Sequence, residues 1–215
     1  MSPSATPGRL LVVDDNKVNR MLLMRNLEQQ GHIVSLAVNG QEALEKLKAA
    51  AFDLVLLDIE MPEMDGYQVL AAMKQDNHLR HIPVIMVTAV DEVASAIRCI
   101  EMGAEDYLPK PFDPVLLRAR IEACLEKKRL RDKEQLYLKS LEREMEIGRE
   151  IQAGFLPGSL PNVPGLEIAA FFKAAHEVAG DFYDAFLLPD GNLVWVIGDV
   201  CGKGVGAALF MALCR

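Results

Sequence analysis

The first 125 residues alternate short apolar runs with segments of helical spacing. The apolar runs are Arg9–Val13, Ile33–Ala37, Leu54–Leu57, Val84–Val87 and Tyr107–Leu108. Between them, apolar residues recur every three or four positions, which is the helical period, in Met21–Leu27, Gln41–Ala50, Tyr67–Met73 and Asp91–Met102. Continuous apolar runs bounded by turn residues are typical of strands buried on both faces of a parallel sheet. The pattern predicts an α/β fold with a five-stranded, doubly wound parallel sheet.

Charged and hydroxyl residues follow these apolar runs. Asp14 and Asp15 follow the first run, Asp58 the third, Thr88 the fourth and Lys110 the fifth. A single acid at a strand end is most often a cap or turn residue, but parallel strands bring their carboxyl ends to one edge of the sheet. Clustered carboxylates there would bind Mg²⁺. Asp58 would accept a phosphoryl group as nucleophile, with Lys110 offsetting its charge and Thr88 donating to a phosphate oxygen.

A long helix is predicted after Asp113-Pro114, a favourable pair for starting one. No Pro or Gly occurs between Val115 and Ile147, and a helix of that length spans roughly 50 Å. Its first turns should pack on the sheet through Val115, Leu117, Ile121 and Leu125. The highly charged stretch 127–134 should lie in water.

The last part of this helix carries a stripe at three- and four-residue steps. Its members are Tyr137 or Leu138, Leu141, Met145, Gly148 and Gln152. The spacing is compatible with a coiled-coil seam, and a homodimer through the helix is our interpretation. A solvated rigid linker is the alternative.

Residues 156–165 are rich in Pro and Gly and indicate a boundary. Three strands are then predicted over Leu166–Phe172, Asp181–Leu188 and Leu193–Asp199. Pro189-Asp190-Gly191 suits a three-residue hairpin loop between the last two strands. That loop sets a register in which Asp181 faces Asp199, with Cβ atoms about 5 Å apart. The pair indicates a divalent-metal site that could activate a water for attack on phosphate, or else two surface acids at a frayed strand end.

Composition narrows the functional classes. The chain has 215 residues, of which 51% are apolar and 25% charged, an ordinary globular balance. No apolar run approaches a membrane span and no signal-peptide pattern is present, so neither a membrane nor secretion is expected. The net charge of −8 argues against a nucleic-acid partner. Four scattered cysteines indicate free thiols and a cytoplasmic location: Cys99, Cys124, Cys201 and Cys214.

The first region resembles a response-regulator receiver domain. The resemblance rests on Asp14-Asp15, Asp58, Thr88 and Lys110-Pro111. It implies a flavodoxin-like fold and a histidine kinase or phosphotransfer protein as the phosphoryl donor. It also implies that Thr88 and Tyr107 form a switch pair and that the Lys110–Pro111 bond is cis.

The same resemblance implies a Mg²⁺ site. Its ligands would be Asp15, Asp58 and the backbone carbonyl of Glu60, with Asp14 supporting them. Asp58 would then carry the phosphoryl group.

The last region is similar to PPM-type metal-dependent protein phosphatases of the sporulation and stress-response branch. The similarity rests on Glu150-Ile151-Gln152 to Leu156-Pro157, Glu177 to Asp184, Gly198 to Gly204, and Ala207-Ala208-Leu209. It implies that Asp181, Asp199 and the Val200 carbonyl hold Mn²⁺ or Mg²⁺. The implied substrate is phosphoserine or phosphothreonine on an anti-sigma-factor antagonist. Ala179 stands where the family usually has glycine.

Two other motifs are weaker matches to the last region. Gly198–Lys203 is one residue short of a phosphate-binding loop and lacks the Ser or Thr after the lysine. Ala179–Phe182 is similar to the diguanylate-cyclase signature, but Phe182 replaces its Glu. The chain stops 16 residues after Asp199, so we expect the start of a longer phosphatase domain that is inactive alone.

These observations predict four segments. They are a disordered N-terminus (1–8), a receiver domain (9–125), a helical linker (126–155) and the N-terminal part of a phosphatase domain (156–215). The expected function is a two-component response regulator that controls the phosphatase. The alternative is an adaptor that sequesters a sigma factor or its antagonist through a non-catalytic phosphatase-like domain. A transcription factor is disfavoured by the acidic charge and by the phosphatase motifs at the output position.

Overall fold

The computed structural model of the chain describes residues 7–88, 93–173, 179–201, 206, 207 and 209. The chain divides into two compact units, Met1–Lys133 and Glu134–Arg215. Within the described residues, no helix combines the length and the apolar character that a membrane span requires.

The first unit is built on a five-stranded parallel sheet in the order β2-β1-β3-β4-β5. Its strands are β1 (Arg9–Val13), β2 (Ile33–Ala37), β3 (Leu54–Asp58), β4 (Val84–Thr88) and β5 (Asp106–Pro109). All four neighbouring pairs are parallel. The predicted doubly wound parallel sheet is therefore confirmed.

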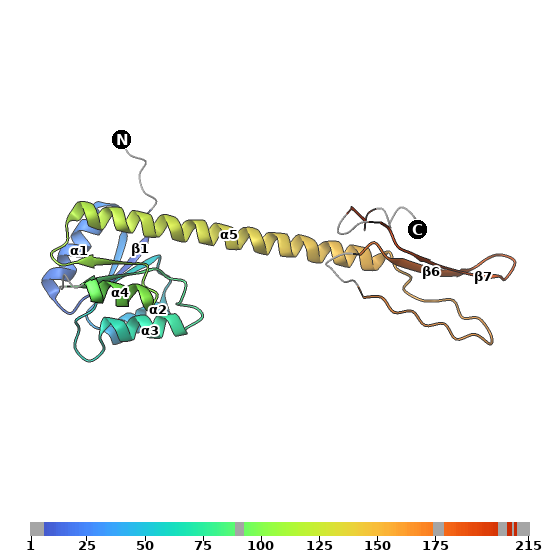
Figure 1. The fold of residues 1–215 in the computed structure, drawn as a ribbon, viewed down its shortest axis with the longest axis horizontal. Coiled ribbons are helices and arrows are strands. Elements are labelled where there is room, and N and C mark those ends of the chain that lie inside the picture. The colour runs from blue at the N-terminus through green and yellow to red at the C-terminus, as the bar shows by residue number, and fades with distance from the viewer. Residues whose placement is uncertain (1–6, 89–92, 174–178, 202–205, 208, 210–215) are drawn as a thin grey trace, which may run out of the picture. The chain divides into compact units, whose positions relative to one another are not determined.

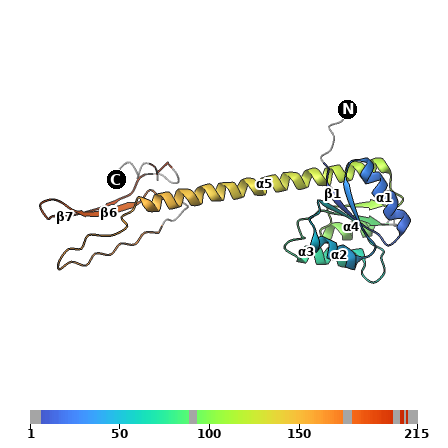
Figure 2. The ribbon, with the colours of Figure 1, turned by 180° about the vertical axis from the view of Figure 1, so that it is seen from behind.

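Helices cover both faces of this sheet, as Figures 1 and 2 show from opposite sides. They are α1 (Lys17–Gln29), α2 (Gly40–Ala49), α3 (Gly66–Gln75), α4 (Val93–Glu101) and the start of α5 (Pro114–Gly154). The predicted start of α4 at Asp91 lies outside the described residues. Alternate residues of the strands point to opposite faces, and the core splits accordingly. Leu10, Val12 and Leu56 pack with α1 and α5, whereas Leu11, Val55 and Leu57 pack with α2, α3 and α4.

Helix α5 begins as predicted. The Asp113 side chain accepts hydrogen bonds from the backbone N–H groups of Val115 and Leu116, at 2.7 and 3.1 Å, and so caps the helix. Leu117, Ile121 and Leu125 are buried against the sheet, with Cys124 beside them. The prediction for Val115 was wrong: its exposed fraction is 76% because it lies on the solvent side of the first turn.

The charged stretch of α5 does not simply lie in water. Arg131 donates to Glu105 at 2.9 Å, and Lys127 forms a second ion pair with the same carboxylate. Lys128 Nζ lies 3.6 Å from a carboxylate oxygen of Asp53. These ion pairs fasten α5 to the first unit well beyond its last apolar contact at Leu125.

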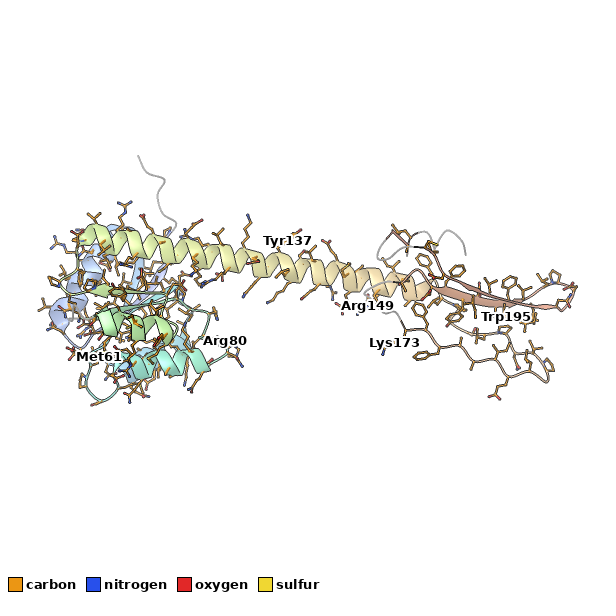
Figure 3. All side chains as sticks on the ribbon, in the orientation of Figure 1. Met61, Arg80, Tyr137, Arg149, Lys173 and Trp195 are labelled. Atoms are coloured by element: carbon orange, nitrogen blue, oxygen red, sulfur yellow. The ribbon has the colours of Figure 1, made fainter. Side chains whose placement is uncertain are left out.

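The second unit contains the final turns of α5 and a two-stranded antiparallel sheet of β6 (Phe182–Leu187) and β7 (Leu193–Gly198). The hairpin register is the predicted one: Leu187 pairs with Leu193, and the Leu188 N–H donates to the Asn192 carbonyl at 2.8 Å. Figure 3 shows Trp195 on β7.

The predicted strand Leu166–Phe172 was wrong. Only an isolated bridge between Val163 and Leu166 forms there. An extended apolar run becomes a strand only when its backbone groups pair with a neighbouring strand. Here no ladder forms along 167–173, and the exposed fraction of Phe171 is 87%.

Candidate phosphoacceptor site

The Lys110 ammonium joins two of the predicted acids at the carboxyl edge of the sheet. Its Nζ lies 2.7 Å from an Asp58 carboxylate oxygen and 2.8 Å from an Asp14 carboxylate oxygen. Lys110 comes from the loop after β5, Asp58 from the end of β3 and Asp14 from the loop after β1, so distant parts of the chain converge. The Lys110 N–H also donates to the Thr88 carbonyl at 2.6 Å, which ties this loop to the end of β4.

Three carboxylates cluster at this edge. One carboxylate oxygen from each of Asp14, Asp15 and Asp58 lies within 4.8 Å of the others. Asp14 and Asp58 are buried, whereas Asp15 is exposed. Hard oxygen ligands at this separation suit a divalent cation such as Mg²⁺, which needs only one or two carboxylates and keeps several waters. The residues present therefore fit a Mg²⁺ ion.

Sequence reasoning missed three residues that hold Asp14. The Asn16 N–H and the Asn19 side-chain amide donate to one oxygen of the Asp14 carboxylate, at 2.8 and 3.4 Å. The Arg20 guanidinium donates to the Asp14 backbone carbonyl at 2.6 Å. With Lys110 on its other oxygen, the Asp14 carboxylate has donors on both sides. Only Asn16 carried a sequence signal, because an Asn directly before a helix is a favoured cap.

Glycine at position 66 allows the chain to pass close to Asp58. A Cβ atom on Gly66 would lie 2.2 Å from the Asp58 carbonyl oxygen and 2.9 Å from the Ile59 Cα. The Gly66 N–H donates to the Ile59 carbonyl at 2.9 Å, and the Asp65 side chain caps α3. The loop after β3 is thereby folded back against Asp58.

Burial shifts the ionisation of the central pair. Burial raises the pKa of Asp58 to about 6; the Lys110 ammonium opposes this rise, and Asp14 and Asp15 add to it. Burial disfavours the charged form of Lys110, but Asp14 and Asp58 outweigh it and raise the pKa of the ammonium. The Asp58 carboxylate is thus mostly ionised above pH 7, as a nucleophile must be.

The remaining predicted receiver residues lie close to this edge. Thr88 is buried at the end of β4. Tyr107 on β5 is partly buried and packs against the part of the core that lies under α2, α3 and α4. The Arg120 guanidinium carbon lies over the Tyr107 ring, 5.4 Å from the ring centroid. Glu60 is exposed just after β3. The Lys110–Pro111 bond is cis, which confirms that prediction.

The family model for the response regulator receiver domain matches residues 10–122 of this chain. The chain belongs to the response regulator receiver family. The matched residues include the acidic cluster (Asp14, Asp15 and Asp58) and Lys110.

Relatives match this chain over part of their own length. The response regulator PleD of Caulobacter vibrioides is 37% identical over 159 residues, which is 74% of this chain and 33% of PleD. The alkaline phosphatase synthesis transcriptional regulatory protein PhoP of Bacillus subtilis is 39% identical over 117 residues, 54% of this chain and 48% of PhoP. The chain spans between about a third and about a half of the curated relatives it matches first.

A solved structure supports the same fold. The receiver domain of the Francisella response regulator 1452 has a TM-score of 0.53 and 29% identity, and the match covers 56% of this chain and 98% of that one. The likeness is thus to the receiver domain of this protein.

The second predicted site lies in the other unit. The Val200 N–H donates to the Gly180 carbonyl at 3.3 Å, which continues the register of β6 and β7 by two pairs beyond the last pair, Phe182 and Gly198. Asp181 therefore lies opposite Asp199, and both line a cavity of about 740 Å³. Asp184 lines the same cavity, but among the residues that the structure describes no third side chain lies close enough to Asp181 and Asp199 to complete a metal-binding group. Two carboxylates fit a divalent cation only as part of a larger ligand set.

Parts of the phosphatase-like motifs fall outside the described residues. They are Glu177, Val178, Gly202, Lys203, Gly204 and Ala208. Of the cysteines, Cys99, Cys124 and Cys201 are free thiols, and Cys214 is outside the described residues. Residues 1–6 of the predicted disordered N-terminus also lie outside the described residues. Within the same segment, the Gly8 N–H donates to His32 Nδ1 at 3.1 Å.

Proposed function

We propose that Asp58 accepts a phosphoryl group from a phosphohistidine of a histidine kinase or phosphotransfer protein. The observation that carries this proposal is the Lys110 ammonium held between Asp58 and Asp14 at the carboxyl edge of the sheet. A lysine on one buried acid could be structural. A lysine shared by two members of a three-acid cluster, inside a receiver domain, favours phosphoryl chemistry.

In this transfer an Asp58 carboxylate oxygen attacks phosphorus. The P–O bond forms as the P–N bond to imidazole breaks, and the imidazole takes a proton as it leaves. Bound Mg²⁺ would supply charge neutralisation for the transferring phosphoryl oxygens, with Asp15, Asp58 and the Glu60 carbonyl as its ligands. Lys110 contacts the acyl phosphate, and Thr88 donates its hydroxyl to a phosphoryl oxygen.

The experiment is phosphorylation of the whole chain by acetyl phosphate with Mg²⁺, followed by intact mass. We expect one added phosphoryl group, its loss in Asp58→Asn, and its retention in Asp113→Asn. Asp113 is exposed and acts only as the α5 cap, a role Asn performs equally well. Full phosphorylation of Asp58→Asn would refute the assignment.

For the output, we propose a PPM-type phosphatase site at Asp181, Asp199 and the Val200 carbonyl, binding Mn²⁺ or Mg²⁺. Its substrate would be a phosphoserine or phosphothreonine protein, with an anti-sigma-factor antagonist as the proposed target. The opposed aspartates beside a cavity support this proposal, because like charges face each other across strands at a cost unless a cation lies between them. Phosphorylation of Asp58 would bias this site through α5.

Manganese titration tests the metal site. Trp195 on β7 is the single tryptophan of the chain and lines the same cavity. In an Asp15→Asn background, which weakens the receiver site, we expect Mn²⁺ to quench its fluorescence saturably and Asp181→Asn to abolish the quenching. Asp190→Asn in the hairpin loop is the matched control. Turnover of a phosphoserine peptide then tests activity.

The alternative is an adaptor that binds a sigma factor or its antagonist without catalysis. One observation favours it: among the described residues, Asp181 and Asp199 belong to no group of three side chains close enough to hold a metal ion. Absence of Mn²⁺ binding at Asp181 and Asp199 would decide for the adaptor. The three free cysteines support a reducing compartment for either function, and we propose the cytoplasm.

A further inference from the structure

Gln152 is the one buried side chain of α5 between residues 126 and 154, a stretch that the structure describes in full. Its exposed fraction is 4%, whereas that of its neighbour Ile151 is 57%. Buried positions on helices are normally apolar, because a polar group taken out of water needs hydrogen-bond partners. The position therefore requires an explanation in terms of what the amide binds.

Both polar groups of the Gln152 amide bind one residue, Ala179. The Ala179 N–H donates to Gln152 Oε1 at 3.0 Å, and Gln152 Nε2 donates to the Ala179 carbonyl. The amide thus pairs with the backbone of Ala179 as a neighbouring strand would, through one donor and one acceptor. Both residues belong to the second unit.

The residues after Ala179 lead directly to the proposed metal site. The Gly180 carbonyl accepts the Val200 N–H, and a Cβ on Gly180 would lie 2.6 Å from the Val200 carbonyl oxygen. The next residue is Asp181, opposite Asp199. The segment that leads into Asp181 and β6 is therefore held twice, at Ala179 by Gln152 of the helix and at Gly180 by Val200, which follows β7.

We infer that Gln152 is a positioning residue through which α5 sets the location of the Asp181 carboxylate relative to Asp199. The inference rests on the proposed phosphatase and deepens it, because it names the contact by which the helix reaches that site. A rotation or shift of α5 that withdraws Gln152 breaks both hydrogen bonds together. Ala179 is then released and Asp181 loses one of its two supports.

The test replaces Gln152 with Met, which has a similar length but neither amide group. In the whole chain we expect backbone amide exchange at Ala179, followed by NMR, to accelerate about 10-fold or more, because its acceptor is removed. The Mn²⁺ dissociation constant, read from Trp195 fluorescence in the Asp15→Asn background, should rise about 10-fold. Gln152→Met should leave the helix content, measured by circular dichroism, unchanged. Without the Asp15→Asn substitution, it should also leave the phosphorylation of Asp58 unchanged.

Two further variants separate a positioning role from a general loss of packing. Ile151→Met, on the same turn but exposed, should leave Ala179 exchange and Mn²⁺ affinity unchanged. Gln152→Glu keeps an acceptor for the Ala179 N–H but opposes the Ala179 carbonyl, so amide protection should fall less than in Gln152→Met.

The outcomes are distinct. Unchanged Ala179 exchange in Gln152→Met overturns the inference. Accelerated exchange with unchanged Mn²⁺ affinity also overturns it, because Asp181 would then not depend on Gln152. If the protein with Gln152 unsubstituted does not bind Mn²⁺ at all, the proposed phosphatase is refuted. The proposed role of Asp181 as a metal ligand is then refuted as well.

Discussion

The Cα of Gly66 packs directly against the carbonyl group of Asp58. A methyl group at position 66 would lie 2.2 Å from that oxygen, and its other neighbours are also backbone atoms of Asp58 and Ile59. Backbone atoms in a buried strand cannot move aside as the end of a side chain can. The identity of residue 66 and the placement of Asp58 are thus coupled.

We therefore expect Gly66→Ala to lower the free energy of unfolding by about 2–3 kcal/mol, in the range of overpacked sites, and to slow phosphorylation of Asp58. Urea unfolding followed by circular dichroism measures the first effect. Gly154→Ala at the end of α5 is the control, because a Cβ there meets nothing within 4 Å. It should be neutral or stabilising by up to about 1 kcal/mol. Equal stability of the two variants would contradict the coupling.

A second expectation concerns the ionised Asp58 carboxylate in the absence of metal. Its folded pKa of about 6 lies above its ordinary value of 3.8. Between these values the folded state binds more protons than the unfolded state, so the free energy of unfolding falls as pH rises from about 4 to 6. Above pH 6 the ionised group costs up to about 3 kcal/mol.

Asp58→Asn removes this cost. In EDTA, we expect the variant to match the Asp58 protein near pH 4 and to be more stable above pH 6, by up to about 3 kcal/mol. Asp113→Asn should show no such difference. Adding Mg²⁺ should stabilise the Asp58 protein more than the variant. A variant that is less stable at pH 8 would mean that Lys110 overcompensates burial.

The convergence of the strand-end side chains could be predicted from the sequence because it depends only on topology. Once Asp58 and Lys110 are assigned to the ends of parallel strands, their convergence follows. The donors to Asp14 could not be predicted in the same way, because Asn19 and Arg20 reach it from the side of a helix whose rotation the sequence does not give. The ion pairs of Glu105 with Arg131 likewise depend on how α5 lies against the first unit.

Apolar pattern alone also failed where pairing decides. The run Leu166–Phe172 has the composition of a strand, but composition does not supply a partner. Conversely, Gln152 was assigned to a coiled-coil seam by its spacing, whereas it is buried against Ala179 within the same chain. A polar residue in a seam was the signal that could have been followed.

His32 provides a third expectation. Its Nδ1 accepts the Gly8 N–H at 3.1 Å, so the ring proton lies on Nε2, which is buried without a partner among the described residues. Burial lowers the pKa of His32, and Arg129 lowers it further against the opposing effect of Glu122. A lowered pKa means that the unfolded chain takes up the proton first, so stability is lost as pH falls below about 6.5.

Replacing His32 with Gln, whose side-chain oxygen can still accept from Gly8, should flatten this dependence. We expect the melting temperature to fall less between pH 7 and pH 5 in His32→Gln than in the His32 protein. His78→Gln is the control, because His78 is exposed. An unchanged slope in His32→Gln would show that the pKa of His32 is the same in the folded and unfolded states.

The last expectation concerns the homodimer that we propose through α5. With Gln152 used inside the chain, the available seam is Leu138, Leu141 and Met145, with exposed fractions of 51%, 39% and 37%. Figure 3 shows how side chains such as Tyr137 project from this part of α5. Apolar side chains spaced by three and four residues can pack against the same stripe of a second copy. A charge at the centre of the stripe should therefore prevent pairing.

Leu141→Glu places that charge, and Leu136→Glu is its matched control. Leu136 is also an exposed leucine of α5, with an exposed fraction of 69%, but lies two residues from Leu138 and hence on a different side of the helix. Sedimentation equilibrium over a range of concentrations should show a dimer for the unsubstituted protein and for Leu136→Glu, and a monomer for Leu141→Glu. Dissociation by both substitutions would mean that added charge, not the seam, decides. If the unsubstituted protein is a monomer at every concentration, α5 is a rigid linker without a pairing role.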